Sequence, residues 1–165
     1  MKIVVYTDGA CKGNPGSGGW AYVCLFNGKP HMIASGHKDD TTNNCMELTA
    51  IYKALNYIKK YNGVYHFNIE YFFICSDSAY CINAINQNWI ENWKRNGWKT
   101  NKNIEIKNKD IWEKVYNLLK EFGNVKFVKV KAHNGVNGMR LQTRKQVKLQ
   151  YMVLESIYFS KLEGL

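Results

Sequence analysis

The sequence contains little proline and no long apolar segment. Only 2 of its 165 residues are Pro, and its 13 Gly follow no triplet repeat, which excludes collagen-like and linker-like chains. No apolar run approaches the ~18 residues that a membrane-spanning helix needs, and Met1-Lys2-Ile3 leads directly into a strand pattern rather than a signal peptide. The length suits one globular domain, and we expect no membrane partner.

Cysteine is present, but no C-x-x-C pair occurs and the number of cysteines is odd. An odd number without paired spacing favours reduced thiols over a disulfide framework. We therefore expect a cytoplasmic protein. The five cysteines are Cys11, Cys24, Cys45, Cys75 and Cys81.

Acidic residues are scarce in the second half of the chain, and none occurs between Phe122 and Leu154. Residues 1–84 hold seven Lys or Arg against six Asp or Glu, whereas residues 85–165 hold sixteen against seven, and the net charge is +10. A basic half of this kind commonly faces nucleic-acid phosphates. A solvated basic face is the alternative interpretation.

Apolar periodicity predicts an α/β domain, a mixed sheet with helices, in the order β-β-β-α-β-α-α-β. The β-branched run Ile3–Thr7 is the first strand, and Asn27-Gly28 marks the hairpin between the second and third. A long helix begins near Asn43-Asn44, both good N-caps, and ends at Asn62-Gly63. The other predicted strands cover 20–25, 31–36, 69–75 and 125–130; a turn covers 12–19, an aromatic and basic segment covers 89–98, and two further helices begin near Ala79 and near Asn108-Lys109-Asp110, the second of these ending at Gly123.

Three acidic residues lie at the ends of predicted elements. Asp8 ends the first strand, Glu47 lies in the first turn of the long helix, and Asp77 ends the central strand. If the two strands are neighbours, both aspartates project at the same edge, where Glu47 can reach them. Clustered carboxylates repel one another unless divalent cations lie between them, and their oxygens suit Mg²⁺ or Mn²⁺. The structural alternative is a turn residue, a helix N-terminal acid and an N-cap.

Four segments occur in the order and at the spacing of one enzyme family. They are Thr7-Asp8-Gly9-Ala10-Cys11-Lys12-Gly13-Asn14-Pro15-Gly16, Thr41-Thr42-Asn43-Asn44-Cys45-Met46-Glu47-Leu48, Ser76-Asp77-Ser78-Ala79-Tyr80 and Trp89-Ile90-Glu91-Asn92-Trp93-Lys94-Arg95-Asn96-Gly97-Trp98-Lys99-Thr100. The chain from residue 3 to about 138 strongly resembles bacterial-type (type I) ribonuclease H, and the last segment resembles that family's basic protrusion. The resemblance implies a ribonuclease H-like domain over residues 1–138. Its fold is a five-stranded mixed sheet, three antiparallel strands and then two parallel ones, flanked by helices.

The resemblance also implies an activity, the endonucleolytic hydrolysis of the RNA strand of RNA–DNA hybrids to 5′-phosphate and 3′-hydroxyl ends. Asp8, Glu47 and Asp77 would then be the catalytic ligands of two Mg²⁺ ions, which Mn²⁺ can replace, and Asp8 would bridge both ions. The family places a catalytic histidine where His133 stands, and imidazole titrates in the range useful for moving protons. Type I relatives suggest a monomer.

Two groups of residues are candidates for binding the hybrid. Amide side chains suit the 2′-hydroxyls and base edges of a wide minor groove, although turn and capping roles are equally open to them. The aromatic and basic segment favours contact with the DNA-strand backbone, although helix packing beside a solvated basic edge gives the same pattern. The candidates are Asn14, Asn43 and Asn44 in the first group, and Trp89, Trp93, Lys94, Arg95, Trp98 and Lys99 in the second.

After Gly138 the resemblance ends, and residues 139–165 form an atypical tail. The family continues with a motif like Gly-Asn-Glu-x-Ala-Asp, whose aspartate is a fourth carboxylate, and with a final helix. Restoring one adenine before the Met139 codon, with codons chosen among synonyms, converts Met139–Lys148 into Asn-Glu-Ile-Ala-Asp-Lys-Lys-Ala-Ser-Glu. The aspartate then falls where Thr143 stands. We hypothesise that the tail is frameshifted, which leaves a catalytically impaired hybrid-binding protein as the alternative function.

Overall fold

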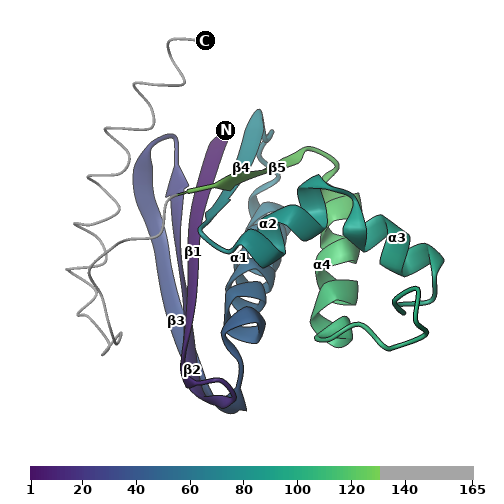
Figure 1. Cartoon of the computed structure of the whole chain (residues 1–165). Helices are drawn as coiled ribbons and strands as arrows, with labels where there is room; N and C mark the ends of the chain where they lie inside the picture. The colour runs from purple at the N-terminus through teal and green to yellow at the C-terminus, as the bar shows by residue number, and fades with distance from the viewer. Residues whose placement is uncertain (131–165) are drawn as a thin grey trace.

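The computed structural model describes residues 1–130, in which a five-stranded sheet carries four helices (Figure 1). The strand order in the sheet is β3-β2-β1-β4-β5, so the first strand lies in the middle. The strands are β1 (Lys2–Gly13), β2 (Gly16–Phe26), β3 (Lys29–Thr41), β4 (Tyr71–Ser76) and β5 (Val125–Lys129). The helices are α1 (Asn43–Tyr65), α2 (Ala79–Asn86), α3 (Trp89–Arg95) and α4 (Lys109–Phe122).

The direction of the strands changes at β1. The strand pairs β1–β2 and β2–β3 are antiparallel, whereas β1–β4 and β4–β5 are parallel. In the parallel β1–β4 pair, Val5 lies opposite Ile74 and Thr7 lies opposite Ser76. The predicted fold class, a mixed sheet of three antiparallel strands followed by two parallel ones, is confirmed.

Alternation along β1 divides the core between the two faces of the sheet. Ile3 and Val5 point to the face on which α1, α2 and α4 pack, together with residues such as Leu55 and Trp112. Val4 and Tyr6 point to the opposite face, where a smaller apolar cluster forms. That second cluster consists of Val4, Tyr6, Val23, Leu25 and Cys75. Along β1, odd-numbered residues therefore face the helices and even-numbered residues face the opposite side.

Several element boundaries differ from those expected. The predicted turn at 12–19 is shorter, because Gly16, Gly18 and Gly19 pair as strand residues and only the Asn14–Pro15 connection, which has a cis peptide bond, is left. The segment 89–98 contains a helix, α3, so three helices rather than two separate β4 from β5.

The long helix α1 also differs from expectation at both ends. Its N-cap is Thr42, whose side chain accepts a hydrogen bond from the Cys45 N–H, so Asn43 is already helical. The helix continues past Gly63 to Tyr65 and ends at His66, which adopts φ 49°. The helix beginning at Ala79 and the stop of α4 at Gly123 are confirmed.

Two further observations concern the class of protein. No helix within residues 1–130 is long and apolar enough to cross a membrane. All five cysteines are free, and four of them are buried.

Candidate active site

Asp8 and Asp77 lie beside each other where the parallel pairing of β1 with β4 ends. Thr7 and Ser76 are the last pair of the parallel β1–β4 register, and each aspartate is the next residue of its chain segment. Because side chains alternate along β1, Asp8 shares the face of Val4 and Tyr6, opposite the helices. The structure confirms that β1 and β4 are neighbours. The predicted strand end at Asp8 is wrong, because β1 continues to Gly13 in its pairing with β2.

Gly9 brings the first turns of α1 against β1. Because the side chain of Asp8 lies on the face opposite the helices, a side chain at Gly9 would be directed toward α1. A Cβ atom at Gly9 would lie 2.2 Å from the Glu47 backbone nitrogen and 2.4 Å from the Met46 carbonyl carbon. Only a residue without a side chain permits this approach, and as a result Glu47 lies directly against the strand that carries Asp8.

Both oxygens of the Glu47 carboxylate accept hydrogen bonds. Asn43, one helical turn earlier, donates its Nδ2–H to Oε1 at 3.3 Å, and Ser78 donates its Oγ–H to Oε2 at 2.6 Å. Ser78 follows Asp77 directly, so this second bond joins the start of α2 to α1. The Glu47 side chain is thus held from its own helix and from the adjacent strand end.

Burial is the largest influence on Glu47 and raises the pKa of its carboxyl above the ordinary value. The hydrogen bond from Ser78 lowers that pKa, whereas the charges of Asp77 and Asp8 raise it further. The pKa of the Glu47 carboxyl therefore responds to the charges of both aspartates. Carboxylate oxygens are the donors that Mg²⁺ and Mn²⁺ prefer, so the donor chemistry of these three side chains fits a divalent cation.

The three carboxylates do not form a compact metal-binding group in the described residues. Within residues 1–130, no group of three or more His, Cys, Asp or Glu side chains is close enough together to hold a metal ion. Asp8 and Asp77 extend from the sheet, whereas Glu47 reaches them from a helix on the other face. The metal-ligand role of Asp8, Glu47 and Asp77 stays a prediction.

The amide candidates surround the N-terminus of α1. Asn14, in the β1–β2 connection, accepts a hydrogen bond at Oδ1 from the backbone N–H of Asn43 at 3.2 Å. Asn43 in turn donates to Glu47, and Asn44 is exposed. The structure thus places Asn14, Asn43 and Asn44 within one turn of the helix that carries Glu47. Their contact with a substrate stays a prediction.

The aromatic candidates divide between surface and core. Trp89 and Trp93 are half-buried, with ring centroids 6.2 Å apart, and Trp93 also packs edge-on against Trp112 at 5.5 Å. Trp98 is only 4% exposed and packs against Tyr116, so its side chain belongs to the core rather than to a binding surface.

The basic candidates of the same segment are all accessible. Lys94, Arg95 and Lys99 are exposed, at and just beyond the C-terminal end of α3. Figure 1 shows α3 on the side of the molecule away from β1, β2 and β3.

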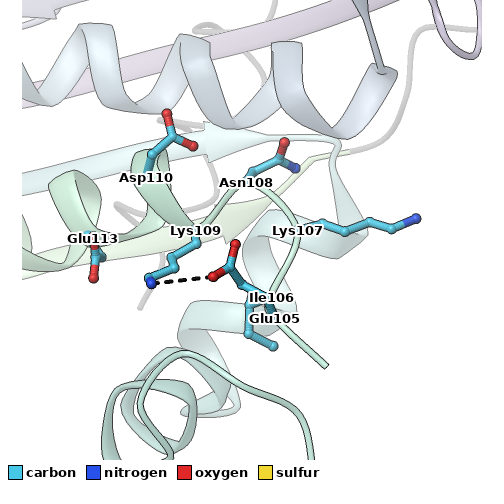
Figure 2. A pocket seen from close by; sticks show the side chains of 7 residues that line it. All are labelled: Glu105, Ile106, Lys107, Asn108, Lys109, Asp110 and Glu113. Atoms are coloured by element: carbon cyan, nitrogen blue, oxygen red, sulfur yellow. Dashed lines mark hydrogen bonds and ion pairs between the residues drawn. The ribbon is translucent and has the colours of Figure 1, made fainter. Parts of the chain in front are cut away.

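A hollow of about 530 Å³ lies elsewhere, where the chain enters α4 (Figure 2). Both signs of charge line it, and Lys109 pairs with Glu105 at 3.5 Å. None of the predicted site residues lines it. The lining residues are Glu105, Ile106, Lys107, Asn108, Lys109, Asp110 and Glu113.

Two predicted features lie outside the described residues, and one residue of the site was missed. His133 and the tail 139–165 lie outside the described residues 1–130. The sequence pattern did not single out Ser78, which is the N-cap of α2 in place of Asp77 and donates a hydrogen bond to Glu47. A serine directly after a strand-end aspartate was the available signal, but its partner lies 31 residues away.

Comparisons with known proteins match this arrangement. The family model RNase H matches residues 1–143. A ribonuclease H of Caldicellulosiruptor saccharolyticus is 44% identical over 133 residues, which cover 81% of this chain and 85% of that protein. A ribonuclease H of Syntrophomonas wolfei subsp. wolfei is 46% identical over 134 residues, covering 81% and 86%.

Solved structures show the same fold. LC11-RNase H1 in complex with an RNA/DNA hybrid aligns with a TM-score of 0.61 at 23% identity, covering 78% of this chain and 85% of that one. The solution structure of the PFV RNase H domain aligns with a TM-score of 0.63 at 20% identity, covering 94% of each chain. The chain therefore has the fold of the ribonuclease H structures.

The family-model match and the identities above show that the chain belongs to the ribonuclease H family. The enzyme class that the sequence predicted, a ribonuclease H hydrolase, is thereby confirmed.

Proposed function

We propose that this chain is an endonuclease that hydrolyses the RNA strand of RNA–DNA hybrids with two divalent cations and leaves 5′-phosphate and 3′-hydroxyl ends. The carrying observation is the pairing of β1 with β4, which sets Asp8 beside Asp77, and the pKa of the Glu47 carboxyl responds to the charges of both. Family membership supports the proposal, and one solved structure of the same fold is a complex with an RNA/DNA hybrid.

Asp8, Glu47 and Asp77 would hold the cations, with Asp8 shared by both. Mg²⁺ suits these carboxylate oxygens, and Mn²⁺ is the expected substitute. When bound, such ions activate a water molecule and stabilise the leaving 3′-oxygen. Within the chain itself, the Asn43 amide and the Ser78 hydroxyl orient Glu47. We propose that His133 moves protons near the leaving product.

The hybrid would lie across two surfaces of the chain. We expect Asn14, Asn43 and Asn44 to contact 2′-hydroxyls and base edges in the minor groove; the hydrogen bond between Asn14 and Asn43 and the exposure of Asn44 support this. We expect Lys94, Arg95 and Lys99, with Trp89 and Trp93 beside them, to contact the DNA-strand phosphates. The exposure of the three basic side chains supports this. Such contacts give binding that depends on salt and not on base sequence.

We also propose that the protein acts as a cytoplasmic monomer. The five free cysteines support a reducing compartment.

The decisive experiment is cleavage of an end-labelled RNA–DNA hybrid by the purified 165-residue chain, in Mg²⁺ and then in Mn²⁺. The matched control is Asp8→Asn, which keeps the shape of the side chain and removes its charge. We expect cleavage of the RNA strand, absent with Asp8→Asn, and fragments whose 5′-phosphates support ligation. Cleavage that survives Asp8→Asn would overturn the proposal.

A second candidate function rests on the missing acid. No acidic residue occurs between Phe122 and Leu154, so the position of the family's fourth carboxylate is not filled by one. Hybrid binding without cleavage by the same preparation would favour a non-catalytic binding protein over the nuclease.

A further inference from the structure

The turn between β4 and α2 is locked by two serine hydroxyls. The Ser78 backbone N–H donates to Ser76 Oγ at 3.2 Å, and Ser78 Oγ accepts from the Cys81 N–H at 3.2 Å as the N-cap of α2. Asp77 is the middle residue of this turn. The backbone that carries Asp77 is therefore held on both sides.

The same Ser78 hydroxyl uses its one proton on another element. Ser78 Oγ donates to Glu47 Oε2 at 2.6 Å, the shorter of the two hydrogen bonds to that carboxylate. Ser78 is only 3% exposed, so water cannot readily take either partner's place. With one donor and one acceptor in use, the hydroxyl has a single orientation that satisfies both contacts.

We infer that Ser78 is a positioning residue that sets the Glu47 carboxylate relative to Asp77 for cation binding, an inference that rests on the proposed function. Asn43 alone cannot supply this relation, because it belongs to α1 as Glu47 does. Ser78 is covalently next to Asp77 and hydrogen-bonded to Glu47, so it joins the two carboxylates across two elements. Groups that orient metal ligands in this way typically contribute about 10- to 100-fold to metal affinity or activity.

The test is Mn²⁺ binding to the full chain without any hybrid, measured by isothermal titration calorimetry. We expect Ser78→Ala and Ser78→Gly to weaken Mn²⁺ binding by about 10-fold or more, and Ser78→Thr, which keeps the hydroxyl, to restore it. Glycine is a better N-cap than alanine, so the two variants differ in thermal stability. Equal losses of Mn²⁺ affinity in both would show that the effect follows the hydroxyl and not the stability of α2.

Two controls separate positioning from general damage. Asn86→Ala removes a hydrogen bond at the other end of α2, from Asn86 Nδ2 to the Phe127 carbonyl at 3.1 Å, and should leave Mn²⁺ affinity unchanged. In a Glu47→Gln background, Ser78→Ala should add no further loss, because Ser78 acts through Glu47.

The inference is overturned if Ser78→Gly binds Mn²⁺ like the wild type, if Asn86→Ala loses as much affinity, or if the wild-type chain binds no Mn²⁺. Hybrid cleavage is scored separately. A chain that binds Mn²⁺ through Ser78 but does not cleave contradicts only the proposed nuclease. Conversely, a chain that cleaves while Ser78→Gly keeps its affinity contradicts only this inference.

Discussion

At the scale of single residues, Gly9 determines how closely α1 approaches the central strand. Its missing side chain leaves room for the backbone of Met46 and Glu47. Both would lie closer to a Cβ atom at Gly9 than Cβ contacts allow. The position of one metal-ligand candidate thus depends on a glycine that has no chemistry of its own.

We expect Gly9→Ala to destabilise the fold by about 1–3 kcal/mol, the usual cost of overpacking, because the added methyl group meets backbone and not a movable side chain. Urea unfolding measures this loss. The matched control is Gly63→Ala within α1, where a Cβ meets nothing within 4 Å, and there we expect a gain of about 0.5–1 kcal/mol. Equal stabilities for wild type and Gly9→Ala would contradict the close packing described here.

Repulsion among the carboxylates predicts a pH-dependent gain from removing one of them. Burial, and then the charges of Asp77 and Asp8, raise the pKa of Glu47 in the folded state. The corresponding stability is present below the ordinary glutamate pKa and is lost as the pH rises through the raised value. In EDTA at neutral pH, Asp77→Asn should raise Tm by about 2–4 °C, the shift that about 1 kcal/mol produces in a chain of this size.

This gain should disappear in acid, where Glu47 is protonated in both proteins. Thermal unfolding followed by circular dichroism at several pH values measures it. Asp110→Asn is the control, since Asp110 lies in the first turn of α4 and favours that helix through its dipole. If both variants raise Tm alike, the effect comes from net charge and not from the carboxylate site.

At the scale of elements, α3 separates what sequence patterns reveal from what they do not. The pattern of 89–98 indicated an aromatic and basic segment but gave no helix start. Its N-cap, Asn88, is of a residue type that favours helix starts, but the short pattern after it gave no helical period. In the structure Asn88 adopts φ 59° and makes no side-chain capping bond. The burial of Trp98 was equally hidden, because an exposed aromatic stripe and a packed one have the same spacing.

The paired aspartates were predictable for a simple physical reason. Each follows an apolar run, and neighbouring parallel strands carry such residues to the same end of their pairing. The sequence did not show that β1 continues beyond Asp8 to Gly13, because that extension depends on pairing with β2. The hydrogen bond from Ser78 to Glu47 was not predictable, because it depends on how α1 lies on the sheet. The glycines at 16, 18 and 19 indicated a turn, yet β2 uses them for pairing with β1.

The exposed basic residues at the end of α3, together with Lys99 beyond it, predict how hybrid binding responds to salt. We expect Lys94→Ala, Arg95→Ala and Lys99→Ala each to weaken hybrid binding regardless of sequence. Each should also reduce the slope of log affinity against log salt by about 1. Fluorescence anisotropy with a labelled hybrid in Ca²⁺ measures both quantities.

The control for this series is Lys60→Ala. Lys60 is exposed and lies near the C-terminal end of α1, away from Glu47. It should leave the salt slope unchanged. Trp98→Ala should behave differently from the basic variants, with a loss of about 3–5 kcal/mol of stability, because its ring lies in the core. A salt slope that none of the three basic variants reduces would remove α3 from the interface.

At the scale of the whole molecule, activity is predicted to depend on a segment outside the described residues. If residues 139–165 are frameshifted as we propose, restoring the family motif should supply the fourth carboxylate. We expect the chain carrying Met139→Asn, Arg140→Glu, Leu141→Ile, Gln142→Ala and Thr143→Asp to cleave the hybrid faster than the wild type in Mg²⁺.

The matched control keeps the first four substitutions and leaves Thr143 unchanged. Single-turnover cleavage rates compare the three chains, and equal rates for all of them would show that a carboxylate at this position has no role. Sequencing the gene across the codons of Gly138 and Met139 tests the origin of the tail independently.

The two hydrogen bonds of Asn43 couple the binding of nucleic acid to the binding of a cation. Its backbone N–H donates to Asn14, a candidate for contacting nucleic acid, and its side chain donates to Glu47, a candidate for holding a cation. A nucleic-acid strand that moves Asn14 therefore also acts on the Glu47 carboxylate, because Asn43 is hydrogen-bonded to both. Linkage then requires reciprocity, so the factor by which a bound hybrid changes cation affinity equals the factor by which the cation changes hybrid affinity.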